Sequence, residues 1–188
     1  MIQLDQFDNR AFDRGAPRWK EVGWWLLRAL VFQSSLPWPS ALKVAVLRAF
    51  GAEVGLGVVI RPRVTIAMPW RLRLGDHVWI GEEVWLLNLA PIEIGSHVCL
   101  SQRCFLCTGS HDFSAPGFDL QTAPIRVGDH CWVAAAAFVG PGVSIGRGAM
   151  VKACVRLTRD LPAGAVADLD GNRPAAEETP GEAAADEA

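Results

Sequence analysis

Two stretches of the chain, LGDHVWIGEEVWL at residues 74–86 and IGSHVCLSQRCFL at residues 94–106, share one spacing of aliphatic residues. In each stretch an aliphatic residue recurs at every sixth position. Neither the 3.6-residue period of a helix nor the two-residue alternation of an ordinary strand produces this step. The aliphatic residues that follow the same spacing are Val54, Ile60, Ile66, Leu74, Ile80, Leu86, Ile94, Leu100, Leu106, Val127, Val133, Val139, Ile145, Val151 and Leu157.

A triangular coil explains the six-residue step, because three short faces, each a strand and a turn, make one rung. Stacked rungs pair as parallel strands and bury the aliphatic column inside the coil. The step lengthens to eight residues between the first three sets, which predicts rungs of 20 residues there. A β-sandwich would not sustain a six-residue step, so the sequence predicts a mainly β fold, a parallel β-helix.

The chain divides by pattern into a helical cap over residues 1–52, the β-helix over residues 53–167 and an acidic tail over residues 168–188 that we expect to be disordered. Residues 19–33 predict an apolar helix that closes the open end of the coil. Ser40 is placed to N-cap a second helix, and Gly51 to end it. The apolar face expected on this second helix comprises Leu42, Ala45, Val46, Ala49 and Phe50.

Composition excludes several classes of protein. The 188 residues include 18 basic and 20 acidic ones, and five of the acidic ones lie in residues 175–188, which we expect to be disordered. The rest has 18 basic and 15 acidic residues, a mild positive charge that is too small to indicate a nucleic-acid-binding protein. The N-terminus resembles no secretory signal, and five unevenly spaced cysteines are typical of a reducing compartment, so we expect a cytoplasmic protein. The aromatic and basic residues of the first helix leave peripheral membrane contact open.

The repeat is interrupted once, after LCTGSHD at residues 106–112. Thirteen residues exceed the length of a 20-residue rung there, which predicts a protruding loop over about residues 112–126. Loops on a rigid scaffold often carry function. His111 stands at the expected root of this loop with Asp112 beside it, and a histidine can act as a general base for a hydroxyl. By position alone, a turn-capping role for His111 is an equal alternative.

The sequence resembles the hexapeptide-repeat acyltransferases, and within them the colanic acid biosynthesis acetyltransferases. The resemblance spans roughly residues 5–166 and includes FDNRAFDRG (7–15), NLAPIEIG (88–95), CFLCTGSHD (104–112) and VGPGVSIGRGAMV (139–151). It implies a left-handed β-helix and a homotrimer with active sites between subunits. It also implies acetyl transfer from acetyl-CoA to a sugar hydroxyl of an exopolysaccharide, without a metal.

The same resemblance assigns roles to individual residues. His111 matches the catalytic histidine of the family, and Asp112 or a backbone carbonyl would orient its imidazole. Asn88 matches an asparagine near the acceptor, although an internal ladder or turn residue is an equal alternative. Trp132 matches a tryptophan beside the donor groove, whose alternative is a plain surface aromatic. The remaining donor-site candidates are Ala134, Gly140 and Gly142 for the pantetheine arm, and Lys152, Arg159 and Arg173 for the phosphates.

Two departures from the family leave a second hypothesis open, a β-helix scaffold that no longer binds the donor. Lys152 and Val155 replace a glycine and a serine that are usual in the family, and the ending after residues 160–162 is altered. A zinc-dependent enzyme of the carbonic anhydrase type is a third hypothesis. His77, His97 and His130 share one repeat position and should stack at a corner, but stacked side chains are parallel, whereas zinc requires convergent ligands. The pair in CFLC, Cys104 and Cys107, and also Cys131, fit the interior of the coil better than a redox site.

Overall fold

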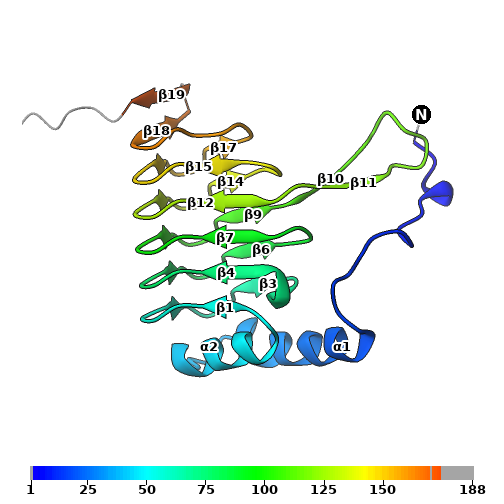
Figure 1. The fold of residues 1–188 in the computed structure, drawn as a ribbon, viewed down its shortest axis with the longest axis horizontal. Helices are drawn as coiled ribbons and strands as arrows, with labels where there is room; N and C mark the ends of the chain where they lie inside the picture. Colours follow the sequence, from blue (N-terminus) through cyan, green and yellow to red (C-terminus); the bar gives the residue numbers. More distant parts are fainter. Residues whose placement is uncertain (1, 170, 175–188) are drawn as a thin grey trace, which may run out of the picture.

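The structure is a computed structural model that describes residues 2–169 and 171–174, and residues 175–188 of the expected tail lie outside them. Within the segment expected to be disordered from residue 168, Gly171–Pro174 instead forms a strand, β19, because it pairs antiparallel with β18 (Ala165–Asp168). It is a left-handed parallel β-helix, as predicted, with three sheets that run the length of the coil (Figure 1). Sheet A contains β1 (Glu53–Val54), β4 (Leu72–Leu74), β7 (Ile92–Ile94), β12 (Ile125–Val127) and β15 (Ser144–Ile145). Sheet B contains β2 (Val59–Ile60), β5 (Trp79–Ile80), β8 (Cys99–Leu100), β13 (Trp132–Val133), β16 (Met150–Val151), β18 (Ala165–Asp168) and β19 (Gly171–Pro174). Sheet C contains β3 (Thr65–Ile66), β6 (Trp85–Leu87), β9 (Phe105–Cys107), β14 (Phe138–Val139) and β17 (Arg156–Leu157).

The aliphatic column forms the core, which confirms the six-residue step. Leu74 pairs with Ile94 in sheet A, and Ile80 pairs with Leu100 in sheet B. The side chains of Ile80 and Leu100 have no solvent exposure. Because parallel pairing keeps equivalent residues in line, one side-chain type fills each column.

The corners between sheets A and B have backbone torsions that suit few residues. His77, His97 and His130 each have a φ between +55° and +59°, a region in which histidine is enriched. Their rings stack with centroids 5.0 Å apart, close to the strand spacing. The glycine before each turn is needed for close approach: a Cβ on Gly75 would lie 2.7 Å from the carbonyl carbon of Gly95.

The outward faces of the three sheets differ in chemistry. Sheet A carries a ladder of alternating charge in which Arg73 forms ion pairs with Glu53 and Glu93. Sheets B and C carry aromatic side chains instead. Trp79 and Trp132 lie on sheet B and Trp85 lies on sheet C, and each has between 44% and 47% of its surface exposed.

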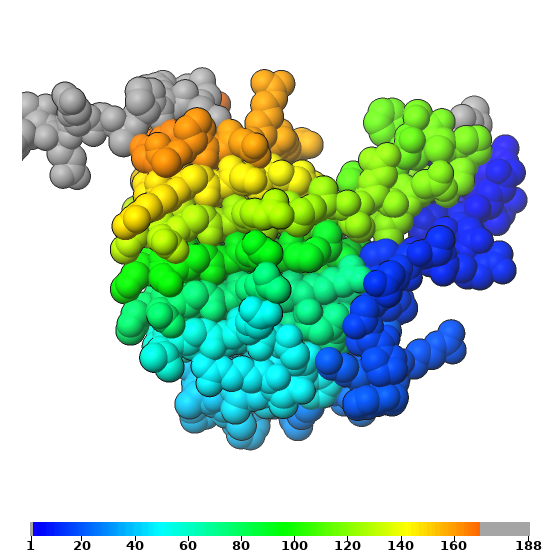
Figure 2. Space-filling model, in the orientation of Figure 1, coloured from blue at the N-terminus to red at the C-terminus, as the bar shows by residue number. Residues whose placement is uncertain are grey.

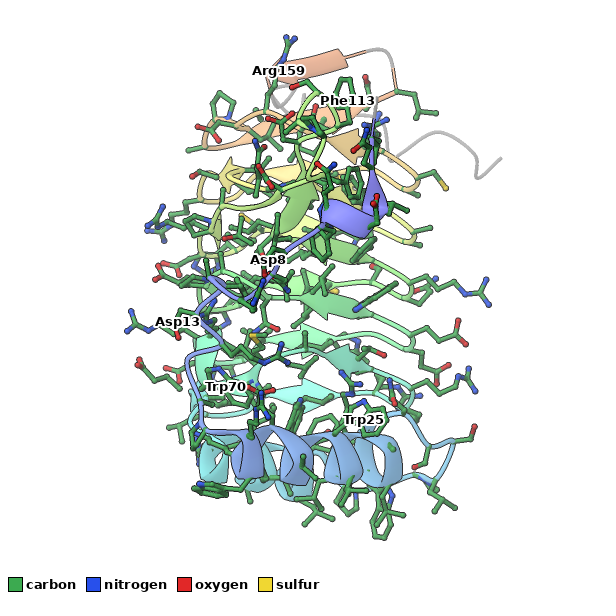
Figure 3. All side chains as sticks on the ribbon, turned by 90° about the vertical axis from the view of Figure 1, so that its right-hand side faces the viewer. Asp8, Asp13, Trp25, Trp70, Phe113 and Arg159 are labelled. Atoms are coloured by element: carbon green, nitrogen blue, oxygen red, sulfur yellow. The ribbon has the colours of Figure 1, made fainter. Side chains whose placement is uncertain are left out.

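Two helices close the open end of the coil below β1 (Figures 1 and 3). α1 (Arg18–Leu27) continues as the π-helix η2 (Arg28–Phe32), and α2 (Ser40–Ala49) follows. Gly51 ends the second helix with a φ of +92°, as predicted. Single 3-10 turns are η1 (Leu4–Gln6) and η3 (Pro69–Arg71).

One expectation for α2 was wrong and another held only in part. Pro39 holds the N-cap position, and the Ser40 hydroxyl accepts a hydrogen bond from the Ile60 N–H (3.0 Å) instead of capping the helix. Of the expected inward face, Val46 and Phe50 pack against the core, but Leu42, Ala45 and Ala49 are exposed, and the fully buried side chains are Lys43 and Leu47. Lys43 lies inward since its ammonium donates to the Ile60 and Arg61 carbonyl oxygens at the open end of the coil.

The expected loop over residues 112–126 is a β-hairpin that begins earlier. β10 (Gly109–His111) pairs antiparallel with β11 (Leu120–Thr122), and Ile125 is already back in sheet A opposite Ile92. His111 therefore lies out along the hairpin, opposite Leu120, and not at its root. The hairpin projects from the corner between sheets C and A (Figure 1).

Candidate functional site

The hairpin is held at its base by a buried threonine. The Thr108 hydroxyl donates to the Leu87 carbonyl oxygen (2.8 Å) and accepts from the Ala90 N–H (2.9 Å). The Ala123 N–H closes the hairpin by donating to the Thr108 carbonyl oxygen (2.9 Å). Since a rigid base limits the motion of the strands that grow from it, β10 holds its side chains in a defined place.

The His111 imidazole is oriented by a backbone carbonyl. Its Nδ1 lies 2.7 Å from the Phe118 carbonyl oxygen, and its ring stacks on the Phe118 ring with centroids 4.2 Å apart. A carbonyl oxygen only accepts, so Nδ1 donates this hydrogen bond, and in the neutral imidazole the lone pair is on Nε2. Phe7 covers the half-buried imidazole from another side, with ring centroids 5.7 Å apart. This arrangement suits a group that takes a proton through Nε2.

The Asp112 carboxylate is hydrogen-bonded within the hairpin turn. Its Oδ1 accepts hydrogen bonds from the Ser114 N–H (2.9 Å) and from the Ser114 hydroxyl (2.5 Å), which places the carboxylate in the hairpin turn. These bonds to the charged form lower the pKa of Asp112 below its ordinary value. Of the two orienting groups considered from sequence, the structure therefore places the carbonyl of Phe118 against the imidazole and Asp112 in the turn.

Residues 2–16 form a strap that runs from the cap to the tip of the hairpin (Figures 2 and 3). The Gln3 N–H donates to the Pro116 carbonyl oxygen (2.9 Å) at the tip. Near the cap, Arg71 donates to the backbone carbonyls of Asp13 and Leu89. The strap is thus tied at both ends, and it brings Phe7 to His111.

A polar pocket of about 470 Å³ lies between the strap and the hairpin. Figure 3 shows Asp8 and Asp13 on the strap at this side of the molecule. This pocket was missed from the sequence, because its walls are far apart in the chain; the motif FDNRAFDRG was the one signal for the strap. The lining residues are Asp8, Asn9, Ala11, Phe12, Asp13, Arg71, Asp119, Leu120 and Thr122.

Asn88 lies inside the corner between sheets C and A. It has no solvent exposure, its Oδ1 accepts from the Met68 N–H (2.8 Å), and its Nδ2 donates to the Met68 carbonyl oxygen (2.6 Å). Both ends of the amide are therefore used by the preceding rung. This geometry is that of the internal turn residue considered from sequence, and the polar groups of Asn88 do not reach the pocket.

The predicted donor-site residues lie along both edges of sheet C. On the edge shared with sheet B, Trp132 is 47% exposed and donates to the Ser101 hydroxyl (2.9 Å). Ala134 follows at the corner and is buried. One rung further along, Lys152 is exposed and lies 3.6 Å from the Asp168 carboxylate.

On the other edge of sheet C, the predicted residues stand above the hairpin. Gly142 is exposed with a φ of +78°, and a Cβ there would lie 3.5 Å from Ala123 at the hairpin base. Gly140 precedes it and is buried, and Arg159 is exposed at the next corner (Figure 3). The backbone of Arg173 pairs with Val166, and its side chain lies outside the described part of the chain.

The thiols and the imidazole stack have the geometry of packing groups. Cys104 and Cys131 are buried, and burial raises the pKa of the Cys104 thiol to about 12. The stacked rings of His97 and His130 are parallel within 2°. Within residues 2–169 and 171–174, no group of three or more His, Cys, Asp or Glu side chains is arranged to hold a metal ion. Across the same residues, none of the helices is long and apolar enough to cross a membrane.

Comparisons with known proteins place the chain in a family, although no family model matches it. A hexapeptide-repeat-containing acetyltransferase from Vibrio cholerae superposes with a TM-score of 0.71 at 25% identity, over 78% of this chain and 84% of that one. Its complex with acetyl coenzyme A superposes with a TM-score of 0.76 at 23% identity, over 92% and 96%. The colanic acid biosynthesis acetyltransferase WcaF from Escherichia coli is 43% identical over 166 residues, which cover 88% of this chain and 91% of the relative.

Together, the fold and these relatives define a hexapeptide-repeat acetyltransferase, and the resemblance inferred from the sequence is confirmed. Within this class, the chain belongs to the family of the colanic acid biosynthesis acetyltransferase WcaF.

Proposed function

We propose that this chain transfers an acetyl group from acetyl-CoA to a sugar hydroxyl in exopolysaccharide biosynthesis, with His111 as the general base. One observation carries the proposal. The bond between His111 Nδ1 and the Phe118 carbonyl oxygen selects the tautomer of the neutral imidazole in which Nε2 has the lone pair, directed away from that bond. Family membership supports the acetyl transfer, and the names of the relatives support the polysaccharide context.

The proposed reaction has two proton transfers, one to His111 Nε2 and one from it. His111 Nε2 takes the proton of the sugar hydroxyl as its oxygen forms a bond to the acetyl carbonyl carbon. The carbon–sulfur bond then breaks, and Nε2 returns the proton to the coenzyme A sulfur. The hydrogen bond to Phe118 and the ring stack keep the imidazole in one orientation through both transfers.

The pocket between the strap and the hairpin is the proposed acceptor site. It borders β11, whose Leu120 pairs with His111, and it offers carboxylates from Asp8, Asp13 and Asp119. Carboxylates accept strong hydrogen bonds from hydroxyl groups, so a ligand rich in hydroxyls fits this lining. A neutral sugar unit is the chemical class proposed here.

The edges of sheet C are the proposed donor site. Gly140 and Gly142 lack side chains above the hairpin base, which leaves room for a narrow chain such as the pantetheine arm. Lys152 and Arg159 are exposed cations on the two edges, and cations suit the phosphates of coenzyme A. The residues present therefore fit the donor, which supplies the activated acetyl thioester.

A homotrimer with sites between subunits is also proposed. The half-exposed Trp79, Trp85 and Trp132 on sheets B and C support it, because tryptophan is enriched where protein surfaces meet. Sheet A, with its charge ladder, would then remain in water. Light scattering at several concentrations tests this assembly.

The test of the reaction compares two histidine variants. His111→Ala is expected to bind acetyl-CoA like the wild type in calorimetry and to lower thiol release with a panel of sugars by about 10²–10⁴-fold. His97→Asn is the matched control, since it replaces an exposed histidine of the corner stack by a residue that tolerates positive φ. Equal loss in both variants would contradict the role of His111. A wild type without acetyl-CoA binding would favour the scaffold hypothesis.

The acceptor pocket is tested separately with Asp8→Asn. This variant is expected to raise the KM for the sugar and to leave the KM for acetyl-CoA unchanged, because Asp8 lines the pocket and lies outside the proposed donor edges. An unchanged sugar KM would move the acceptor away from the strap.

A further inference from the structure

Helix α1 has apolar side chains on two opposite sides. On the inner side, Trp24 is 2% exposed and donates from its indole N–H to the Ile66 carbonyl oxygen (3.0 Å). A helix with apolar side chains on all sides is normally buried on all sides, so exposed apolar side chains on α1 indicate a surface that a partner covers. On the outer side no part of the described chain covers a set of large side chains, here called the cap face: Trp19 (75% exposed), Val22 (57%), Trp25 (66%), Leu26 (65%) and Leu30 (59%).

The cap also differs from the rest of the chain in charge. Residues 17–52 contain five basic residues and one acidic residue, whereas the remainder contains 13 basic and 19 acidic residues. The one acidic residue of the cap, Glu21, is paired with Arg14 at 2.7 Å. Five of these 19 acidic residues lie in residues 175–188, and without them the remainder is close to neutral, with 13 basic and 14 acidic residues. The cap is therefore the cationic end of the molecule, which is complementary to an anionic surface.

A pocket of about 410 Å³ continues from the cap face toward the corner between sheets C and A. Val22 and Trp25 belong to both the cap face and the pocket, and Met68 and Leu89 line its other wall. Its charged lining residues are Arg14, Glu21 and Arg28; Glu21 is paired with Arg14, whereas the buried Nε of Arg28 has no hydrogen-bond partner among the described residues. A guanidinium stays charged in proteins, and a buried charge without a partner is unfavourable. An anionic group beside apolar groups would therefore pair with Arg28.

We propose that the cap face docks on an anionic phospholipid bilayer, with a lipid phosphate beside Arg28. Exposed tryptophan and leucine next to basic side chains are the chemistry that binds the interface of a membrane. The cap lies at one end of the coil, so α1 can rest on a plane without obstruction by the hairpin or the sheets (Figure 1). The contact is peripheral, and it is independent of the proposed reaction.

Vesicle sedimentation with the full chain tests the docking. The wild type is expected to sediment with phosphatidylcholine vesicles that contain about a third phosphatidylglycerol, and at least tenfold less with phosphatidylcholine alone. Arg28→Gln is expected to weaken binding about fivefold, as expected for one basic residue at an anionic surface. The double variant Leu26→Glu and Leu30→Glu is expected to abolish sedimentation. Leu169→Glu is the matched control, because Leu169 is 79% exposed and lies at the opposite end of the coil.

Two results would overturn the proposal. The first is sedimentation that does not depend on the acidic lipid or that survives both glutamate substitutions. The second is a change of oligomeric state in the Leu26→Glu and Leu30→Glu variant by light scattering, which would show that another copy of the chain covers the cap face. Acetyl transfer to a water-soluble sugar is expected to be unchanged in this variant, so a failed docking leaves the proposed reaction untouched.

Discussion

Substitution of Asn88 by alanine tests whether Asn88 stabilises the fold or binds the acceptor. The amide of Asn88 makes two buried hydrogen bonds, of 2.8 and 2.6 Å, to the N–H and carbonyl oxygen of Met68. Alanine would leave the Met68 N–H buried without a partner, whereas the Met68 carbonyl oxygen still accepts from the Arg71 N–H (3.0 Å). One such unpaired group costs about 1–3 kcal/mol, so the free energy of unfolding of the variant is expected to be lower than that of the wild type by about that amount.

Urea denaturation measures this difference, at one protein concentration so that assembly does not shift the comparison. Thr108→Val is the matched control, because it removes the equivalent hydrogen bonds one rung further along while its shape stays the same. Steady-state kinetics of the folded Asn88→Ala variant complete the assay. Its KM for the sugar is expected to equal that of the wild type. A variant with full stability and a raised sugar KM would refute the reasoning and restore Asn88 to the acceptor site.

A second substitution at the same position checks the hydrogen-bond argument by pH. Asn88→Asp keeps the acceptor for the Met68 N–H, but only its protonated form can donate to the Met68 carbonyl oxygen. Burial raises the pKa of such a carboxyl group above its unfolded value, so its stability contribution is present at low pH and is lost as pH rises through the folded pKa. The gap in unfolding free energy to the wild type should therefore narrow at acid pH, and a gap that widens would contradict the geometry.

Burial and hydrogen bonding elsewhere in the chain lead to three further predictions. The exposed Cys154 is expected to react with an aromatic disulfide reagent at pH 8. Cys104 is expected to react only after denaturation, because burial raises its pKa to about 12. Detection by mass spectrometry of modified Cys104 in the native protein would contradict this. Ser114→Ala is expected to move the lowered pKa of Asp112 back up in a carbon-detected NMR titration, and an unmoved pKa would refute the turn assignment. The hydrogen bonds to ionised Asp112 stabilise the turn above the ordinary carboxyl range, and this contribution is lost as pH falls through the folded pKa. Leu100→Ala, at a fully buried position, is expected to lower the free energy of unfolding by about 2–5 kcal/mol in urea, and a loss under 1 kcal/mol would question the core register.

The coil was predictable from the sequence because its signal repeats. Each rung repeats the six-residue step, so residues such as Leu74 and Ile94 could be paired from their spacing alone. The stacking of His77, His97 and His130 at one corner was predictable for the same reason, because they share one position in the repeat. By contrast, Lys43 was not among the residues expected on the inward face of α2, and only the free carbonyl oxygens of Ile60 and Arg61 explain why its side chain lies there.

The site was predictable only in part, because half of it consists of groups that residue type does not reveal. His111 stood out as a histidine at the one interruption of the repeat. The group that orients it is a backbone carbonyl of Phe118, seven residues later, which any residue could supply. The strands β10 and β11 are three residues long, too short for alternation to show. The contact of Phe7 with His111 joins residues 104 positions apart, beyond the reach of any local pattern.

The return of the chain after the hairpin has a consequence for how such proteins diversify. Ser96 and Asp129 are 33 residues apart in sequence yet occupy the same corner on successive rungs, whereas Leu56 and Asp76 do so across 20 residues. The coil above and below is indifferent to what lies between Thr108 and Ile125, since the register on both sides is preserved. The hairpin can thus be lengthened, shortened or exchanged as a cassette while the stack keeps its shape. The 16 residues between Thr108 and Ile125 can therefore change in a related chain while the strands on either side keep their pairing.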